Sequence, residues 1–188
     1  MKYIGDQIES VKARRPNRVG GLPNFTVDQV RDFKPIFSFL NEKDRDILYL
    51  IFVSGKKQRD VQRILGRSQP SLCYDIKRIR KRLRFIFYLH SVFDLFLEFV
   101  SLNGEYFTPH ELEVLTLMFY TSSFTMTANI LDITQVKVRY SFDKCLRKME
   151  ELEMWEVYEM FVIIRSNLNL IKRESRDGSS SKNVFIPI

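Results

Sequence analysis

The sequence predicts an all-α fold, with two helix-turn-helix units joined by a long, largely buried helix and followed by a long C-terminal helix. Seven Gly and six Pro among 188 residues are too few for a sandwich or barrel, which needs frequent turn residues. Apolar residues recur at the three- and four-residue intervals of helices. Two stretches of the chain also repeat each other. The hydrophobic fraction of 45% excludes wholesale disorder and is enough for a sizeable core.

Four segments are expected along the chain. Residues 1–24 form a basic flexible arm, either a solvated tail or an extension that contacts phosphates or the minor groove. Residues 25–103 hold the first unit and the connecting helix. Residues 104–174 hold the second unit and the C-terminal helix, and residues 175–188 form a flexible tail.

The first unit opens with short helices. Thr26 or Asp28 caps a helix that runs to about Phe33, and Pro35 restarts the chain. The next helix begins after an Asn41 cap and ends at Gly55. A short helix from about Lys57 to Leu65 follows and ends at Gly66.

A long helix begins at Ser68 as N-cap, with Pro70 in its first turn, and meets no breaker until Gly104. Beyond Phe85 it is apolar on nearly all sides, which predicts burial between neighbours. Its expected inward positions are Leu72, Ile76, Ile79 and Leu83.

The second unit begins at Thr108, where Pro109 and Glu111 suggest a capping box. A short helix from about Thr125 to Leu131 follows. Another helix starts at Thr134 and runs to about Lys172. Its apolar positions are Val138, Phe142, Cys145, Met149 and Leu152.

The repeat relates the segment beginning at Asp46 to the one beginning at Glu113. At an offset of 67, Ile47, Leu48, Leu50 and Phe52 match Val114, Leu115, Leu117 and Phe119. At an offset of 66, Ile64, Leu65, Ser68, Gln69, Leu72 and Ile76 match Ile130, Leu131, Thr134, Gln135, Val138 and Phe142. The spacing is that of a helix, a turn of about three residues and a second helix.

Positive charge is concentrated in the first unit. The chain has a net charge of +7, while residues 56–84 alone hold eleven Lys or Arg against two acidic residues. Residues 85–121 hold five acidic residues and no Lys or Arg. A focus of this density on a helix-turn-helix predicts binding to double-stranded DNA, with a log–log salt slope near −5 if about six phosphates are neutralised.

The same spacing assigns candidate DNA-binding residues, because a protruding helix fits the major groove and reads it with its first turns. The candidate phosphate contacts are Lys56, Lys57, Arg59, Arg67 and, on the DNA backbone, Lys81. The candidate groove readers are Gln69, Ser71, Tyr74, Lys77 and Arg78. The second unit offers Gln135, Lys137, Arg139 and Lys144. Its hydroxyls suit either weaker DNA contact or a protein interface, and they are Thr121, Ser122, Ser123, Thr125 and Thr127.

The titratable residues predict neither an enzyme nor a cofactor or metal site. His90 and His110 are the two histidines, and no Gly-rich phosphate loop or Ser/His/Asp set is present. Cys73 and Cys145 lack metal-ligand spacing and are expected to be small packing residues.

A cytoplasmic, nucleoid-associated protein is expected. The N-terminus has no apolar signal core. The apolar stretch Phe85–Leu102 is close to the length of a membrane span, but it contains His90, Asp94 and Glu98, which are costly in lipid. We therefore expect a buried helix and no membrane contact.

The first unit resembles region four of bacterial sigma factors over residues 40–85. The resemblance lies in an apolar helix, the basic run IKRIRKRL and the intervening residues Gln58, Asp60, Val61, Ile64, Leu65, Gly66, Ser68, Gln69, Pro70 and Ser71. Over residues 107–152 the second unit resembles the C-terminal domain of LuxR-type regulators. That resemblance lies in FTPHELEVL and in Ala128, Leu131, Ile133, Lys137, Val138 and Arg139. The two resemblances imply promoter-type DNA binding and a contact with RNA polymerase.

The leading expectation is a sequence-specific transcription regulator or sigma-like accessory factor from a virus or mobile element. One alternative is the DNA-recognition subunit of a viral packaging machine, similar to a small terminase. Another is an RNA-polymerase-binding protein that reuses the fold. The segment EMWEVYEMFVII is expected to pack in the core, with a homo-oligomer seam as the alternative.

Overall fold

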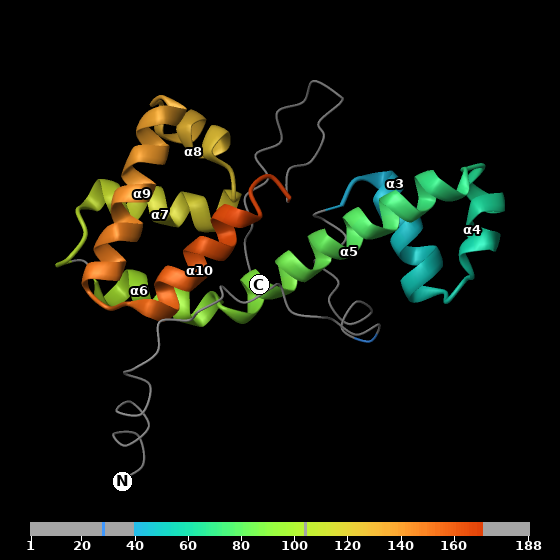
Figure 1. Ribbon diagram of the computed structural model, residues 1–188, viewed down its shortest axis with the longest axis horizontal. Helices are drawn as coiled ribbons and strands as arrows, with labels where there is room; N and C mark the ends of the chain where they lie inside the picture. Colours follow the sequence, from blue (N-terminus) through green and yellow to red (C-terminus); the bar gives the residue numbers. More distant parts are fainter. Residues whose placement is uncertain (1–27, 29–39, 104, 171–188) are drawn as a thin grey trace, which may run out of the picture.

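The computed structural model describes Asp28, residues 40–103 and residues 105–170. Every regular element in these ranges is a helix, so the predicted all-α fold is confirmed. The elements are α3 (Glu42–Leu48), η3 (Tyr49–Val53, a π-helical turn), α4 (Gln58–Leu65), α5 (Gln69–Ser91), α6 (Phe93–Leu102), α7 (Pro109–Thr121), α8 (Phe124–Leu131), α9 (Gln135–Glu151) and α10 (Trp155–Ser166). Figure 1 shows α3 and α4 around one end of α5, and α7 to α10 gathered beyond its other end.

Several sequence predictions fall outside the described residues. They concern the arm at 1–24, the restart at Pro35, the tail at 175–188 and most of the helix expected over 26–33. Asp28, within that last range, is helical.

The first group of helices begins and ends where its local sequence predicts. The Asn41 side chain accepts a hydrogen bond from the backbone N–H of Asp44 and so caps α3. Gly55 and Gly66 have φ values of +63° and +61°, the left-handed region that favours glycine at helix ends. Ser68 is the N-cap residue of α5, although its side chain makes no capping hydrogen bond.

The helix that begins after Ser68 bends before it reaches the second group. α5 has 23 residues and is therefore about 34 Å long. It ends at Ser91, and α6 continues after a bend of 46° at Val92. Within the described part of the chain, no single helix meets the length and apolar composition of a membrane span, although α5 and α6 meet it together as a bent pair.

Aromatic side chains join α6 to the second group. The Phe96 and Phe119 rings stack with their centroids 4.0 Å apart, and Phe161 meets Phe96 edge-on at 6.5 Å. All three side chains are buried. Phe96 and Phe99 of α6 are therefore part of the core of the second group. Leu97 and Leu102 are exposed, so this region is less buried than its composition predicts.

The second group opens with the predicted capping box. The Thr108 hydroxyl accepts from the backbone N–H of Glu111, and the Glu111 carboxylate accepts from the backbone N–H of Thr108. Ser122 ends α7 and Asp132 ends α8, both in the left-handed conformation. Thr134 then caps α9 by accepting from the backbone N–H of Lys137.

The C-terminal helix differs from its prediction. One helix was expected from Thr134 to about Lys172, but α9 ends at Glu151 and α10 is a separate helix. Glu153, with φ at +55°, reverses the chain, and α10 packs against α9, α7 and α6. No Gly or Pro marks this turn, so tertiary packing and not a local breaker ends α9.

The order of elements repeats along the chain. α4 and α8 have eight residues each and lie 66 positions apart, and both are followed by a three-residue turn and a longer helix. The matched apolar positions also share their burial. The buried pairs are Ile47 and Val114, Leu48 and Leu115, Phe52 and Phe119, Leu72 and Val138, and Ile76 and Phe142.

Candidate nucleic-acid interface

The first half of α5 has one buried side and one exposed side. The expected inward residues are all buried, namely Leu72, Ile76, Ile79 and Leu83. On the other side, Tyr74, Lys77 and Lys81 are exposed, as are Gln69 and Ser71 in the first turn. α5 therefore packs through its aliphatic side and presents polar, aromatic and cationic side chains to solvent.

Seven of the eleven basic residues in the block 56–84 are exposed. They come from the turn before α4, from α4 itself and from α5, and they are Lys56, Lys57, Arg59, Arg63, Lys77, Arg80 and Lys81. The Arg80 guanidinium lies over the Phe52 ring at 5.6 Å from its centroid. This set, named here the α4–α5 basic surface, includes Arg63 and Arg80, which the sequence prediction did not select.

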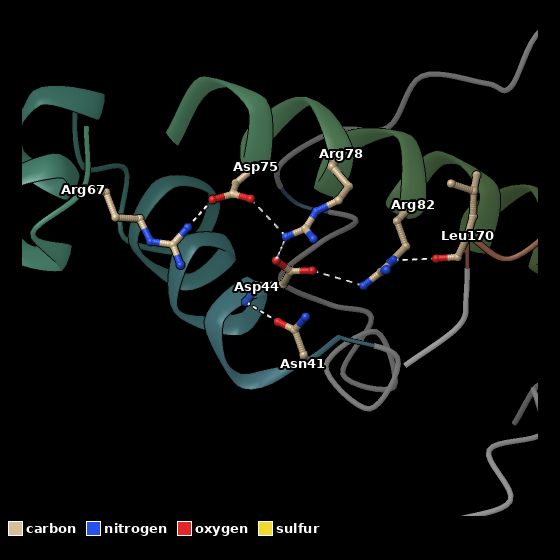
Figure 2. Close-up of polar contacts among 7 residues, drawn as sticks. All are labelled: Asn41, Asp44, Arg67, Asp75, Arg78, Arg82 and Leu170. Carbon is tan, nitrogen blue, oxygen red and sulfur yellow. Dashed lines mark hydrogen bonds and ion pairs between the residues drawn. The ribbon is translucent and has the colours of Figure 1, made fainter. Parts of the chain in front are cut away.

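Other arginines of the block contact carboxylates within the molecule. Figure 2 shows Arg78 donating to Asp44 at 2.5 Å and to Asp75 at 3.1 Å. Arg67 contacts the other oxygen of Asp75. Arg67 and Arg78 were expected to contact DNA, but in the structure both guanidinium groups form ion pairs between the turn, α3 and α5.

Arg82 lies deepest in this network. It is buried and donates to Asp44 at 3.1 Å and to the backbone carbonyl of Leu170 at 2.5 Å (Figure 2). Asp44 is fully buried, and burial raises the pKa of its carboxyl while Arg78 and Arg82 oppose the shift. This part of the block is therefore an internal polar network that links α3, α5 and the segment after α10.

The predicted DNA-binding residues of the second group are all exposed, but two of them contact other side chains of the protein. Gln135, Lys137 and Arg139 are exposed on the first turns of α9, where Arg139 lies 5.3 Å from the centre of the Phe124 ring. Lys144 is exposed but forms an ion pair with Glu111 at 2.9 Å. That ion pair raises the pKa of Lys144.

Glu111 is the acceptor at the centre of this contact. Burial alone would raise the pKa of its carboxyl, but the Thr108 backbone N–H, Lys144 and Lys148 together lower it to about 2. Lys148 lies 3.1 Å from the carboxylate and 5.0 Å from the Phe107 ring centroid. Lys144 therefore stabilises the helix arrangement through a buried carboxylate.

The hydroxyls considered for a surface role are mostly internal. Thr121, Ser122, Ser123 and Thr127 are buried, and the Thr121 and Thr127 hydroxyls lie 3.0 Å apart. Ser123 donates to the Asn169 side chain at 3.0 Å. The hydroxyls of Thr121, Ser123 and Thr127 hold the α7–α8 turn, while the buried Ser122 hydroxyl makes no hydrogen bond within the described part of the chain. Neither DNA nor a protein partner can reach these four hydroxyls, whereas Thr125 is exposed.

α10 packs against one side of the second half of α9. Leu146 is buried, and Arg165 of α10 pairs with Asp143 of α9 at 2.8 Å. At the offset of 66, Leu146 corresponds to Arg80 and Asp143 to Lys77, and both residues of the first group are exposed cations. The two groups therefore share a fold but present different surfaces beyond the first two turns of their long helices.

Both cysteines pack against other parts of the protein. Cys145 is fully buried, and burial raises the pKa of its thiol to about 12. The Cys73 thiol lies 3.7 Å from the side-chain oxygen of Gln58 and joins α5 to α4. Within the described residues, no group of three or more His, Cys, Asp or Glu side chains could hold a metal ion.

No protein-family model, curated protein or solved structure matches this chain. The resemblances to sigma factor region four and to LuxR-type domains therefore stay predictions from the residues that carry them.

Proposed function

We propose that the chain binds double-stranded DNA in a sequence-specific manner, as a transcription regulator or sigma-like accessory factor. In this proposal α4 and α5 form a helix-turn-helix, and the first turns of α5 enter the major groove. The observation that carries it is the α4–α5 basic surface, in which seven exposed cations come from α4, α5 and the turn before α4, while the aliphatic side of α5 is buried.

The proposed contacts divide into two kinds. Lys56, Lys57 and Arg59 precede or begin α4 and suit phosphates, as does Lys81 further along α5. The groove readers are Gln69, Ser71, Tyr74 and Lys77, which are all exposed on the first turns of α5. Arg78 holds α5 against α3 through Asp44, Arg67 holds the turn before α5 through Asp75, and in this proposal neither takes a direct part in binding.

The second group is proposed as a weaker DNA contact. Gln135, Lys137 and Arg139 occupy the first turns of α9, in the place of the groove readers of α5. In this proposal these exposed turns approach the duplex, while α10 packs against one side of the second half of α9.

Selection from a pool of random duplexes, followed by a footprint, tests the proposal. A defined motif protected over the selected site is the expected result, because direct base readout discriminates among sequences. A Lys77→Ala, Lys81→Ala variant should lose enrichment, whereas Lys43→Ala, which removes an exposed charge from α3, should retain it. Absence of any enriched motif together with absence of salt-dependent binding would refute the proposed function.

A further inference from the structure

Large apolar side chains are exposed at the same positions of the two groups. In residues 58–82 they are Ile64 and Tyr74, with exposed fractions of 57% and 69%. In residues 124–148 they are Ile130, Val136 and Tyr140, with exposed fractions of 48%, 77% and 66%. At the offset of 66, Ile130 matches Ile64 and Tyr140 matches Tyr74. The position of Val136 is that of Pro70, which is also apolar and exposed.

Apart from Ile64 on α4 and Ile130 on α8, these positions form one stripe on each long helix. Pro70 and Tyr74 are four residues apart on α5, so they lie on the same face. Val136 and Tyr140 have the same spacing on α9. Each stripe begins one residue after an exposed glutamine.

The neighbouring residues are less alike than the stripe itself. Ser71 is matched by Lys137, Cys73 by Arg139 and Asp75 by Ser141, so the polar surroundings differ between the groups. Packing cannot explain the shared stripe, because its side chains contribute little to the core. A ligand surface with apolar parts would explain it.

The chemistry of the stripe fits an adenine–thymine pair in the major groove. A glutamine amide pairs with adenine N6 and N7, and an apolar side chain contacts the thymine 5-methyl group. A guanine–cytosine pair offers no methyl group and is recognised best by Arg or Lys. The exposed cations beside each stripe, Lys77 on α5 and Lys137 on α9, favour a polyanion over an apolar protein surface.

We propose that both groups read adenine–thymine pairs, with Tyr74 and Pro70 on α5, and Tyr140 and Val136 on α9, contacting thymine methyl groups. This inference depends on the proposed DNA-binding function and adds its base preference. It also assigns Tyr140 and Val136, which were not among the predicted site residues, as specificity-determining residues of the second group.

Alternating dA-dT and dA-dU duplexes test the inference, because they differ only in the thymine methyl group. The full chain should bind the dA-dT duplex at least about fourfold more tightly, the ratio that corresponds to one buried methyl group. An alternating dG-dC duplex, which has no thymine, measures the binding that does not depend on adenine–thymine pairs.

Variants assign the effect to each helix. Tyr74→Ser and Tyr140→Ser should each reduce the dA-dT to dA-dU ratio, and the double variant, which keeps Pro70 and Val136, should reduce it further while dG-dC binding persists. Tyr106→Ser removes an exposed tyrosine that precedes α7 and should leave the ratio unchanged. All three side chains are at least 44% exposed, so helicity should match that of the unmodified chain.

The other outcomes separate the two proposals. Equal affinity of the unmodified chain for dA-dT and dA-dU, with tight binding to both, would overturn the methyl readout and leave DNA binding intact. An unchanged ratio in Tyr140→Ser would overturn the assignment on α9 and favour a protein partner for that stripe. Failure to bind all three duplexes would refute the proposed function and this inference together.

Discussion

Asp44 and Glu111 occupy the same position in the two groups of helices. Each is the third residue of its helix, α3 or α7, and the two are 67 positions apart. Each side chain is buried, and the backbone N–H of each is capped by the residue three positions earlier.

The cations that face these acids also correspond. Arg78 and Arg82 contact Asp44, while Lys144 and Lys148 contact Glu111. Both pairs are four residues apart on the long helix and are related by the offset of 66. The acid therefore fixes the long helix to the first helix of each group, and this contact repeats along with the apolar pattern.

The two acids predict opposite responses to pH. The folded-state pKa of Glu111 is lowered to about 2 from an ordinary value of 4.5, so its contribution to stability is complete above pH 4.5 and lost as the pH falls toward 2. The folded-state pKa of Asp44 is raised, so ionisation of its carboxyl opposes folding. Lowering the pH therefore does not reduce the free energy of unfolding through Asp44. We expect the second group to lose free energy of unfolding first in acid, by at most about 3 kcal/mol from this residue.

Fluorescence of Trp155, the one tryptophan of the chain, reports on α10 and can follow this loss. Glu111→Gln should lower stability at pH 7 and flatten the dependence between pH 4.5 and 2. An unchanged acid profile in this variant would contradict the assigned role of Glu111.

A second prediction separates DNA contacts from internal contacts on α5. Replacing Lys77 and Lys81 by Ala should weaken DNA binding at least about tenfold at moderate salt without lowering the free energy of unfolding. Asp44→Ala should lower that free energy by about 3–5 kcal/mol, because it leaves Arg82 buried without its carboxylate. Titration with a selected duplex and denaturant unfolding provide the two measurements. If the lysine variant lost as much free energy of unfolding as Asp44→Ala, Lys77 and Lys81 would be internal contacts and not DNA contacts, which would contradict this prediction.

The number of phosphate contacts can be measured directly. Seven exposed cations form the α4–α5 basic surface, and neutralisation of about six phosphates gives a log–log salt slope near −5. The Lys77→Ala, Lys81→Ala variant should reduce the magnitude of this slope by about one, because Lys81 is the proposed phosphate contact of the pair and Lys77 is a groove reader. A slope near zero for the unmodified chain would exclude an electrostatic duplex contact.

Local signals predicted the fold well because most helix ends are encoded locally. Asn41, Gly66, Thr108 and Thr134 act where their residue types predict, and the inward stripe of α5 is buried as its spacing requires. The end of α9 was not predictable, since Glu153 adopts a left-handed conformation that its residue type does not favour. Packing of α10 on α9 compensates for that cost.

The candidate site was less predictable than the fold. A periodic pattern predicts on which side of a helix a residue lies, but it does not predict whether a carboxylate from another helix contacts that residue. Arg78 shares α5 with Lys77, yet it reaches Asp44, which lies 34 positions earlier in the chain. The repeat held the missing information, because Glu111 lies 33 and 37 residues before Lys144 and Lys148, one residue fewer than the 34 and 38 that separate Asp44 from Arg78 and Arg82.

The final prediction concerns how the two groups are joined. Arg82 contacts Asp44 of the first group and the Leu170 carbonyl, which follows α10 of the second. The same segment is fixed to the α7–α8 turn, since the backbone N–H of Asn169 donates to the carbonyl of Ser122 at 2.8 Å. Arg82 thus completes a chain of contacts between the groups that bypasses α6.

Arg82→Ala should therefore weaken the coupling of unfolding between the groups. We expect Trp155 fluorescence and far-ultraviolet circular dichroism to report different midpoints in this variant and coincident midpoints in the unmodified chain. Arg165→Ala, which breaks an exposed ion pair within the second group, is the matched control and should keep the midpoints coincident. Coincident midpoints in Arg82→Ala would contradict the proposed role of Arg82 in coupling the two groups.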